Sequence, residues 1–64
     1  MKIRKENKHE IVATQTHYSI GLIKSVYCKH RKRMRQYVIE NGTFELISST
    51  NIERDINSVF GSVL

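Results

Sequence analysis

The feature that most limits the fold is the combination of a short chain with a single cysteine. Cys28 has no partner for an internal disulfide, and no paired cysteines suggest a structural zinc site. A chain of 64 residues buries a smaller fraction of its unfolded surface than a larger domain does. We therefore expect one compact hydrophobic core without a metal or other cofactor, built from the apolar side chains between Ile11 and Leu64.

The positive charge is concentrated in the first half of the chain. Residues 1–35 contain ten lysines and arginines against two glutamates, whereas residues 36–64 contain one arginine against four acidic residues. Such a division is typical of a protein with one surface for a polyanion. The first eight residues, MKIRKENK, are predicted to form a flexible basic arm ahead of a single domain over residues 9–64. In the arm, Lys2, Arg4 and Lys5 are candidates for phosphate contacts.

The sequence predicts a cytoplasmic protein. The basic N-terminus is not followed by the apolar stretch of a signal peptide. No apolar run approaches the roughly 20 residues that cross a membrane, so no membrane partner is expected. A single free thiol also suits a reducing compartment.

Residues 19–31, SIGLIKSVYCKHR, have the spacing of an amphipathic helix. At about 100° per residue, the apolar side chains fall on one arc and the small or basic side chains on the opposite arc. The adjacent Leu22 and Ile23 break the alternation that a half-buried strand would show. Ser19 precedes the first apolar residue and suits an N-cap. The segment therefore predicts a helix with a basic outer surface.

Residues 33–49 are predicted to form a β-hairpin, because Asn41-Gly42 separates two alternating stretches. A two-residue turn sets Ile39 opposite Phe44 and Tyr37 opposite Leu46, which makes one side of the ribbon apolar. The rival interpretation extends the preceding helix to Gly42 as its C-terminal cap. That alternative turns Ile39 to the wrong side and leaves the segment after it without a partner strand.

Residues 50–64 predict a closing helix. Thr50 and Glu53 have the spacing of a capping box. Apolar residues follow at helical spacing, namely Ile52, Ile56, Val59, Phe60 and Val63. Only Arg54 is basic here, so we expect this helix to close the core.

Residues 9–16, HEIVATQT, are open to two interpretations. Their β-branched content suits a strand. Val12, Ala13 and Tyr18, however, stand where the inner residues of a helix-turn-helix would lie, with Ala13 at the contact between the helices. We favour the helix, which gives an α+β winged helix-turn-helix with two N-terminal helices, a β-hairpin wing and a C-terminal helix.

This order of elements resembles that of the small winged helix-turn-helix excisionases, or recombination directionality factors, of phages and conjugative transposons. The parallels are EIVATQTHYSIGLIKSVY, QYVIENGTFELI and STNIERDINSVF. Similar wings occur in MerR-type regulators. The resemblance implies a nucleoid-associated protein that binds double-stranded DNA cooperatively beside copies of itself near an attachment site. Such a protein bends the DNA and helps an integrase to excise a mobile element. His17 departs from the glycine usual in the turn.

The predicted DNA contacts lie on the basic helix, the link after it and the wing. Residues near the start of a recognition helix read base edges, whereas lysines and arginines bind phosphates. The candidates for DNA binding are Ser19, Gly21, Lys24, Ser25, Cys28, Lys29, Arg31, Lys32, Arg33, Arg35, Asn41 and Thr43. No catalytic or metal-ligating arrangement stands out, because Cys28 and His30 point apart on a helix and no carboxylate pair or nucleophilic triad is present. We therefore expect no enzymatic activity.

Two alternatives to the excisionase role remain open. The first is a winged-helix transcriptional regulator of a mobile element. The second is a small phage-type inhibitor that acts by protein–protein contact, with the acidic surface around Glu53 and Asp55 as its working side.

Overall fold

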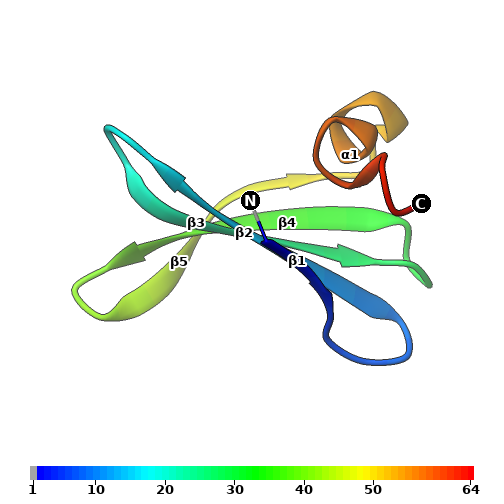
Figure 1. The fold of residues 1–64 in the computed structure, drawn as a ribbon, viewed down its shortest axis with the longest axis horizontal. Helices are drawn as coiled ribbons and strands as arrows, with labels where there is room; N and C mark the ends of the chain where they lie inside the picture. Colours follow the sequence, from blue (N-terminus) through cyan, green and yellow to red (C-terminus); the bar gives the residue numbers. More distant parts are fainter. Residues whose placement is uncertain (1) are drawn as a thin grey trace.

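The chain folds as one antiparallel sheet of five strands with a short helix at its end. The computed structural model describes residues 2–64. The strands are β1 (Lys2–Lys5), β2 (Glu10–His17), β3 (Gly21–Cys28), β4 (Arg33–Glu40) and β5 (Thr43–Thr50), and the helix is α1 (Glu53–Phe60). The strands lie in the sheet in chain order, each paired with the next (Figure 1). The winged helix-turn-helix prediction is therefore wrong, because its two N-terminal helices are strands.

The helix predicted at residues 19–31 is instead the end of the β2–β3 turn, strand β3 and most of the turn that follows it. Ile23 and Tyr27 point towards α1, whereas Leu22 and Val26 point to the other side of the sheet, as alternation along a strand requires. As the middle strand, β3 is partly covered on both sides. A strand covered on both sides carries apolar residues in adjacent positions. The adjacent Leu22 and Ile23 therefore fitted the pattern of a helix.

The two interpretations of residues 9–16 are decided in favour of the strand. Within β2, Ile11, Val12 and Ala13 are all buried, so this strand is also covered on both sides. Ile11 pairs with Tyr27 and Val12 with Val26 in the antiparallel register of β2 and β3. The preceding segment is no loose arm, because Lys2–Lys5 forms the edge strand β1 paired with β2; Met1 lies outside the described residues.

The predicted hairpin around Asn41-Gly42 is confirmed. Ile39 pairs with Phe44 and Tyr37 with Leu46, as expected from a two-residue turn. Asn41 and Gly42 both have positive φ, 53° and 81°, the conformation that a type I′ turn requires. One irregularity was not predicted: the register shifts between Gln36 and Tyr37, which leaves Ile47 as an extra residue in β5.

A C-terminal helix is also confirmed, although it is shorter than expected. It covers Glu53–Phe60, and the capping box does not form: Ile52 occupies the N-cap position without a side-chain hydrogen bond. The Thr50 hydroxyl instead accepts a hydrogen bond from the Ile52 N–H and lies 3.4 Å from an Asp55 carboxylate oxygen. No helix within residues 2–64 is long and apolar enough to cross a membrane.

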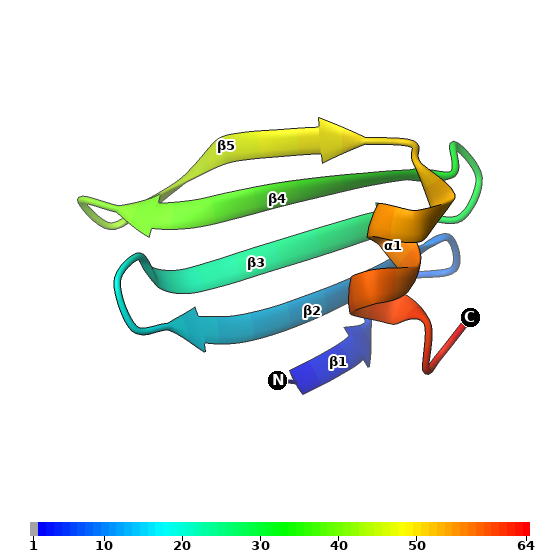
Figure 2. The ribbon, with the colours of Figure 1, turned by 90° about the horizontal axis from the view of Figure 1, so that it is seen from above.

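The core lies between α1 and one face of the sheet. Phe60 and Ile56 are buried against Ile11, Ala13 and Met34 from β2 and β4. Figure 2 shows that α1 crosses only one half of the sheet, at the end where the β1–β2 and β3–β4 turns lie. At the other end, the β2–β3 and β4–β5 hairpins spread apart (Figure 1) because the pairing of β3 with β4 stops at Ile23 and Val38. The face of the sheet turned away from α1, here called the open face, has no second layer within residues 2–64.

Replacing Phe60 tests this core. Phe60 has no exposed surface, so Phe60→Ala leaves a cavity and is expected to lower the free energy of unfolding by about 3–5 kcal/mol. Val63→Ala is the control, because Val63 is 48% exposed and its loss is expected to cost within about 0.5 kcal/mol. Urea unfolding followed by circular dichroism measures both, and equal midpoints for the two variants would contradict the proposed core.

Candidate nucleic-acid interface

Two turns that are far apart in the sequence lie side by side at one end of the sheet. The β1–β2 turn is shaped by Asn7, whose side-chain oxygen accepts hydrogen bonds from the N–H groups of His9 and Glu10. The Lys29 N–H donates to the His9 carbonyl oxygen at 2.7 Å, which joins this turn to the β3–β4 turn. The rings of His9 and His30 also lie 5.9 Å apart between centroids. The charged residues of both turns therefore lie on one surface.

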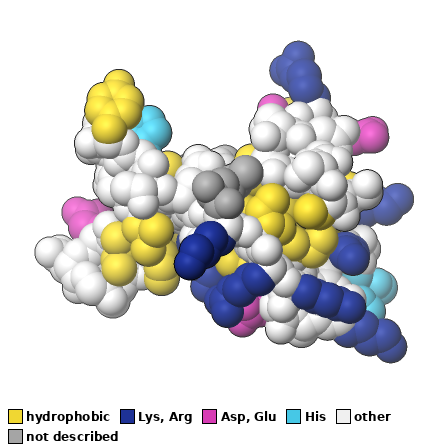
Figure 3. All heavy atoms as spheres, viewed as in Figure 1, with side chains coloured by type: hydrophobic (Ala, Val, Ile, Leu, Met, Phe, Trp, Pro, Cys, Tyr) yellow, Lys and Arg dark blue, Asp and Glu magenta, His cyan; other side chains and the backbone are white. Residues whose placement is uncertain are grey.

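This end of the molecule carries a cluster of cations, here called the basic end. Its members are Lys8, Lys29, Arg31, Lys32, Arg33 and Arg35, and all but the half-buried Arg35 are exposed. Figure 3 shows Lys and Arg side chains gathered there beside histidines. Three of these cations, Lys8, Arg31 and Arg35, line a broad hollow together with Cys28 and Glu10.

The basic end is only slightly neutralised. Arg35 lies 3.9 Å from a Glu10 carboxylate oxygen, and this is the only ion pair that the structure shows for these six cations within residues 2–64. Arg33 donates instead to the Ser49 hydroxyl at 3.2 Å. Lys32 lies in the turn with φ of 53°, a left-handed conformation that lets the chain reverse without glycine. The β3–β4 turn therefore carries a high density of positive charge, and its backbone is hydrogen-bonded to the β1–β2 turn.

Five of the predicted phosphate-binding residues come together, whereas the other three, Lys2, Arg4 and Lys5, lie on the edge strand β1. The predicted recognition surface does not exist. Lys29, Arg31, Lys32, Arg33 and Arg35 all belong to the basic end. Of the residues expected on the outer side of a recognition helix, Ser25 points to the α1 side of the sheet, and Lys24 and Cys28 point to the open face; Gly21 has no side chain.

Three further candidates lie in or directly after turns at the far end from the basic end. The side chain of Ser19 lies in the β2–β3 turn, 2.9 Å from the His17 ring nitrogen. Asn41 lies in the β4–β5 turn, and Thr43 begins β5 directly after it, with its hydroxyl donating to the Glu40 carbonyl oxygen. The predicted wing contacts therefore lie at the opposite end of the sheet from the basic end.

The sequence analysis did not predict two features of the surface. Lys8 and His9 join the basic end through the β1–β2 turn, although nothing in the sequence connects them with residue 29. Phe44 was expected only as part of the apolar side of the hairpin, yet it is 43% exposed on the open face with the Lys24 ammonium above its ring. The alternation that predicted the hairpin correctly identified the side of Phe44 but not its exposure.

Metal ions in proteins are most often held by histidine, cysteine and acidic side chains. In the part of the chain that the structure describes, no group of three or more such residues is placed to hold an ion. Comparison of the chain with models of protein families, with curated proteins and with solved structures finds no match.

The burial of Ser25 distinguishes the observed strand from the predicted helix. Ser25 is 2% exposed and accepts a hydrogen bond from the Gln36 amide at 3.1 Å. Ser25→Lys is therefore expected to bury an uncompensated charge and to lower the free energy of unfolding by about 3–5 kcal/mol. Ser58→Lys places the same charge on the exposed side of α1 and is expected to change stability little. Urea unfolding compares the two; wild-type stability for Ser25→Lys would instead favour an outward-facing position.

Proposed function

We propose that this protein binds DNA without acting as an enzyme, and that its basic end contacts the phosphate backbone. The observation that carries the proposal is the convergence of six lysines and arginines on two joined turns and the first residues of β4, with Glu10 as the single carboxylate in an ion pair with them within residues 2–64. Lysine and arginine side chains on a polyanion release condensed counterions, which supplies much of the free energy of nucleic-acid binding.

The distribution of acidic residues supports the same orientation. Glu40 and Glu45 lie on the β4–β5 hairpin, whose turn is at the end opposite the basic end. A polyanion is repelled from this region and attracted to the basic end, so the field of the whole protein orients the encounter.

The excisionase and regulator roles expected from the resemblance both depended on a recognition helix. The corresponding residues form the strand β3. We therefore keep DNA binding as the proposal and abandon the insertion of a helix into the major groove. Cooperative binding of several copies, contact with an integrase and association with the nucleoid remain hypotheses that a DNA-binding surface allows.

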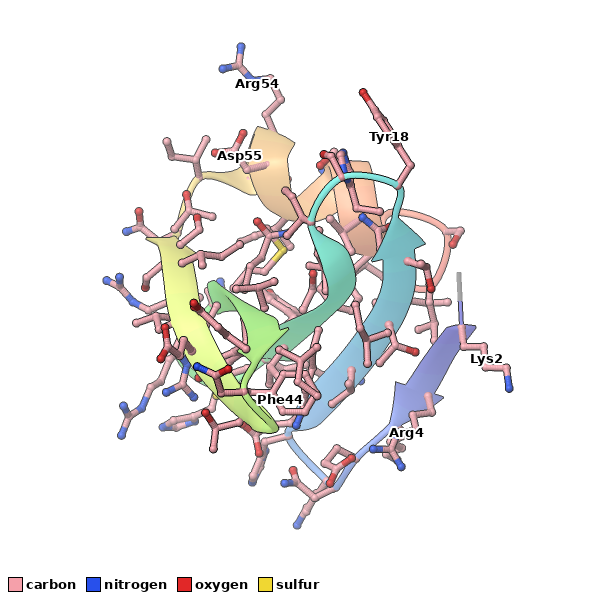
Figure 4. All side chains as sticks on the ribbon, turned by 90° about the vertical axis from the view of Figure 1, so that its left-hand side faces the viewer. Lys2, Arg4, Tyr18, Phe44, Arg54 and Asp55 are labelled. Atoms are coloured by element: carbon pink, nitrogen blue, oxygen red, sulfur yellow. The ribbon has the colours of Figure 1, made fainter. Side chains whose placement is uncertain are left out.

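A charge-reversal pair tests the proposal. Arg31→Glu changes an exposed cation of the basic end and is expected to weaken DNA binding about tenfold or more, because a charged phosphate contact is lost. It is also expected to reduce the slope of log K against log salt by about one. Arg54→Glu makes the same charge change on α1, where Arg54 points away from the sheet (Figure 4), and is expected to retain near wild-type affinity.

Fluorescence anisotropy of a labelled DNA fragment, measured at several salt concentrations, gives both quantities. Equal losses of affinity in Arg31→Glu and Arg54→Glu would mean that only net charge matters, and the assignment to the basic end would be wrong. Absence of any salt-dependent binding by the wild-type protein would reject DNA binding itself.

Contact with a protein partner is the second candidate, and Tyr18 is the observation that favours it. Tyr18 is 98% exposed at the β2–β3 turn and stacks on the His17 ring with centroids 4.8 Å apart. Tyrosine is enriched among the residues that dominate protein interfaces. Tyr18 points away from the body of the molecule (Figure 4). Tyr18→Ala is therefore expected to leave DNA affinity unchanged, and the same anisotropy titration measures it.

A further inference from the structure

The open face contains a second hollow next to the basic end. Val12 and Val26 contribute apolar lining to it, and its volume is about 280 Å³. Two aromatic residues, Tyr37 and Phe44, line it together with two cations, Lys24 and Arg35. Tyr37 and Phe44 occupy diagonal positions on the same side of the β4–β5 hairpin, since Tyr37 pairs with Leu46 and Ile39 with Phe44. Apolar lining, aromatic rings and cations are thus combined in one concave surface.

The contact between Lys24 and Phe44 can be replaced by contacts of each side chain with a ligand. The Lys24 ammonium lies 5.2 Å from the centroid of the Phe44 ring, and the ring remains 43% exposed. Figure 4 shows Phe44 turned from β5 inwards over the sheet. A cation above an aromatic ring at a solvated site is held only weakly. A flat base can therefore take the position above the ring while the ammonium moves to a neighbouring phosphate.

The carboxylates at the rim of this hollow are already engaged. Glu6 lies 3.1 Å from the Arg4 guanidinium. Glu10 accepts a hydrogen bond from the Asn7 amide at 2.7 Å and faces Arg35 at 3.9 Å. Lys24 makes no ion pair with any residue from 2 to 64, so its charge remains available to an anion.

We infer that the open face binds single-stranded DNA, with a base stacked on Phe44 and the adjacent phosphates bound by Lys24 and Arg35. Aromatic side chains interleaved with cations are the usual surface for unpaired strands, because every base has a face that can stack. A duplex keeps its bases stacked inside and offers only base edges in its grooves, so it cannot fill this hollow in the same way. This inference rests on the proposed function and specifies the form of DNA.

The path of the strand follows from Arg35, which lines both hollows. Phosphates bound at the basic end continue past Arg35 to Lys24, and the base between them reaches Phe44. The basic end supplies attraction for any nucleic acid, whereas Phe44 supplies the preference for unpaired bases.

The test compares a labelled 15-nucleotide single strand with the duplex of the same sequence by fluorescence anisotropy. We expect the wild-type protein to bind the single strand at least tenfold more tightly. Phe44→Leu keeps an apolar side chain but removes the stacking surface, and is expected to weaken single-strand binding on the order of tenfold with an unchanged salt slope. Tyr18→Ala removes an exposed aromatic ring elsewhere and is expected to have no effect.

Phe44→Trp adds a fluorescent reporter to a chain that has no tryptophan. Stacking of a base on the indole is expected to quench its emission on addition of the single strand, with affinity retained. Equal affinity for the single strand and the duplex, together with wild-type binding by Phe44→Leu and no quenching in Phe44→Trp, would overturn this inference. The proposed function would survive that outcome if Arg31→Glu still weakened binding more than Arg54→Glu. It would fail if neither form of DNA bound or if the two variants lost affinity equally.

Discussion

The packing of Phe60 and Ile56 on the sheet is the contact on which the rest of the structure depends. A single antiparallel sheet needs a second layer to bury apolar side chains, and α1 is the only helix within residues 2–64. Its two buried residues close a core with Ile11, Ala13 and Met34. Because α1 is short and covers one half of one face, no second layer packs over the opposite face within residues 2–64, where Val12 is buried by its neighbours in the sheet but Phe44 remains 43% exposed. The element that stabilises the protein thereby also determines which surface is free to bind.

The order of the strands determines where the charges meet. In a meander of antiparallel strands, alternate turns lie at the same end of the sheet. The β1–β2 and β3–β4 turns are therefore neighbours, and the hydrogen bond from Lys29 to His9 joins them. Basic residues separated by about twenty positions in the chain become one surface. The β2–β3 and β4–β5 turns lie at the other end, which separates Tyr18 and Asn41 from the basic end.

The parts predicted correctly depend on neighbours in the sequence. Asn41-Gly42 supplies a turn with positive φ, and the alternation beside it places Ile39 opposite Phe44. The prediction failed at residues 9–31 because β2 and β3 are covered on both sides and lose their alternation. The β3–β4 turn also gave no signal, since Lys29-His30-Arg31-Lys32 contains none of the usual turn residues and reverses through Lys32 with φ of 53°. The individual phosphate-binding candidates were identified by charge alone, which does not depend on secondary structure.

The sequence by itself determined the hairpin at Asn41-Gly42, a C-terminal helix and the excess of cations before residue 36. Each of these follows from local backbone preference, short-range periodicity or composition. Only the tertiary structure decided that residues 9–28 are strands, that Ser25 is buried and that Phe44 is exposed beside Lys24. The physical reason is that a strand obtains its hydrogen bonds and its burial from other strands. Its position in the sheet, and not its own pattern, therefore decides which side chains reach the surface.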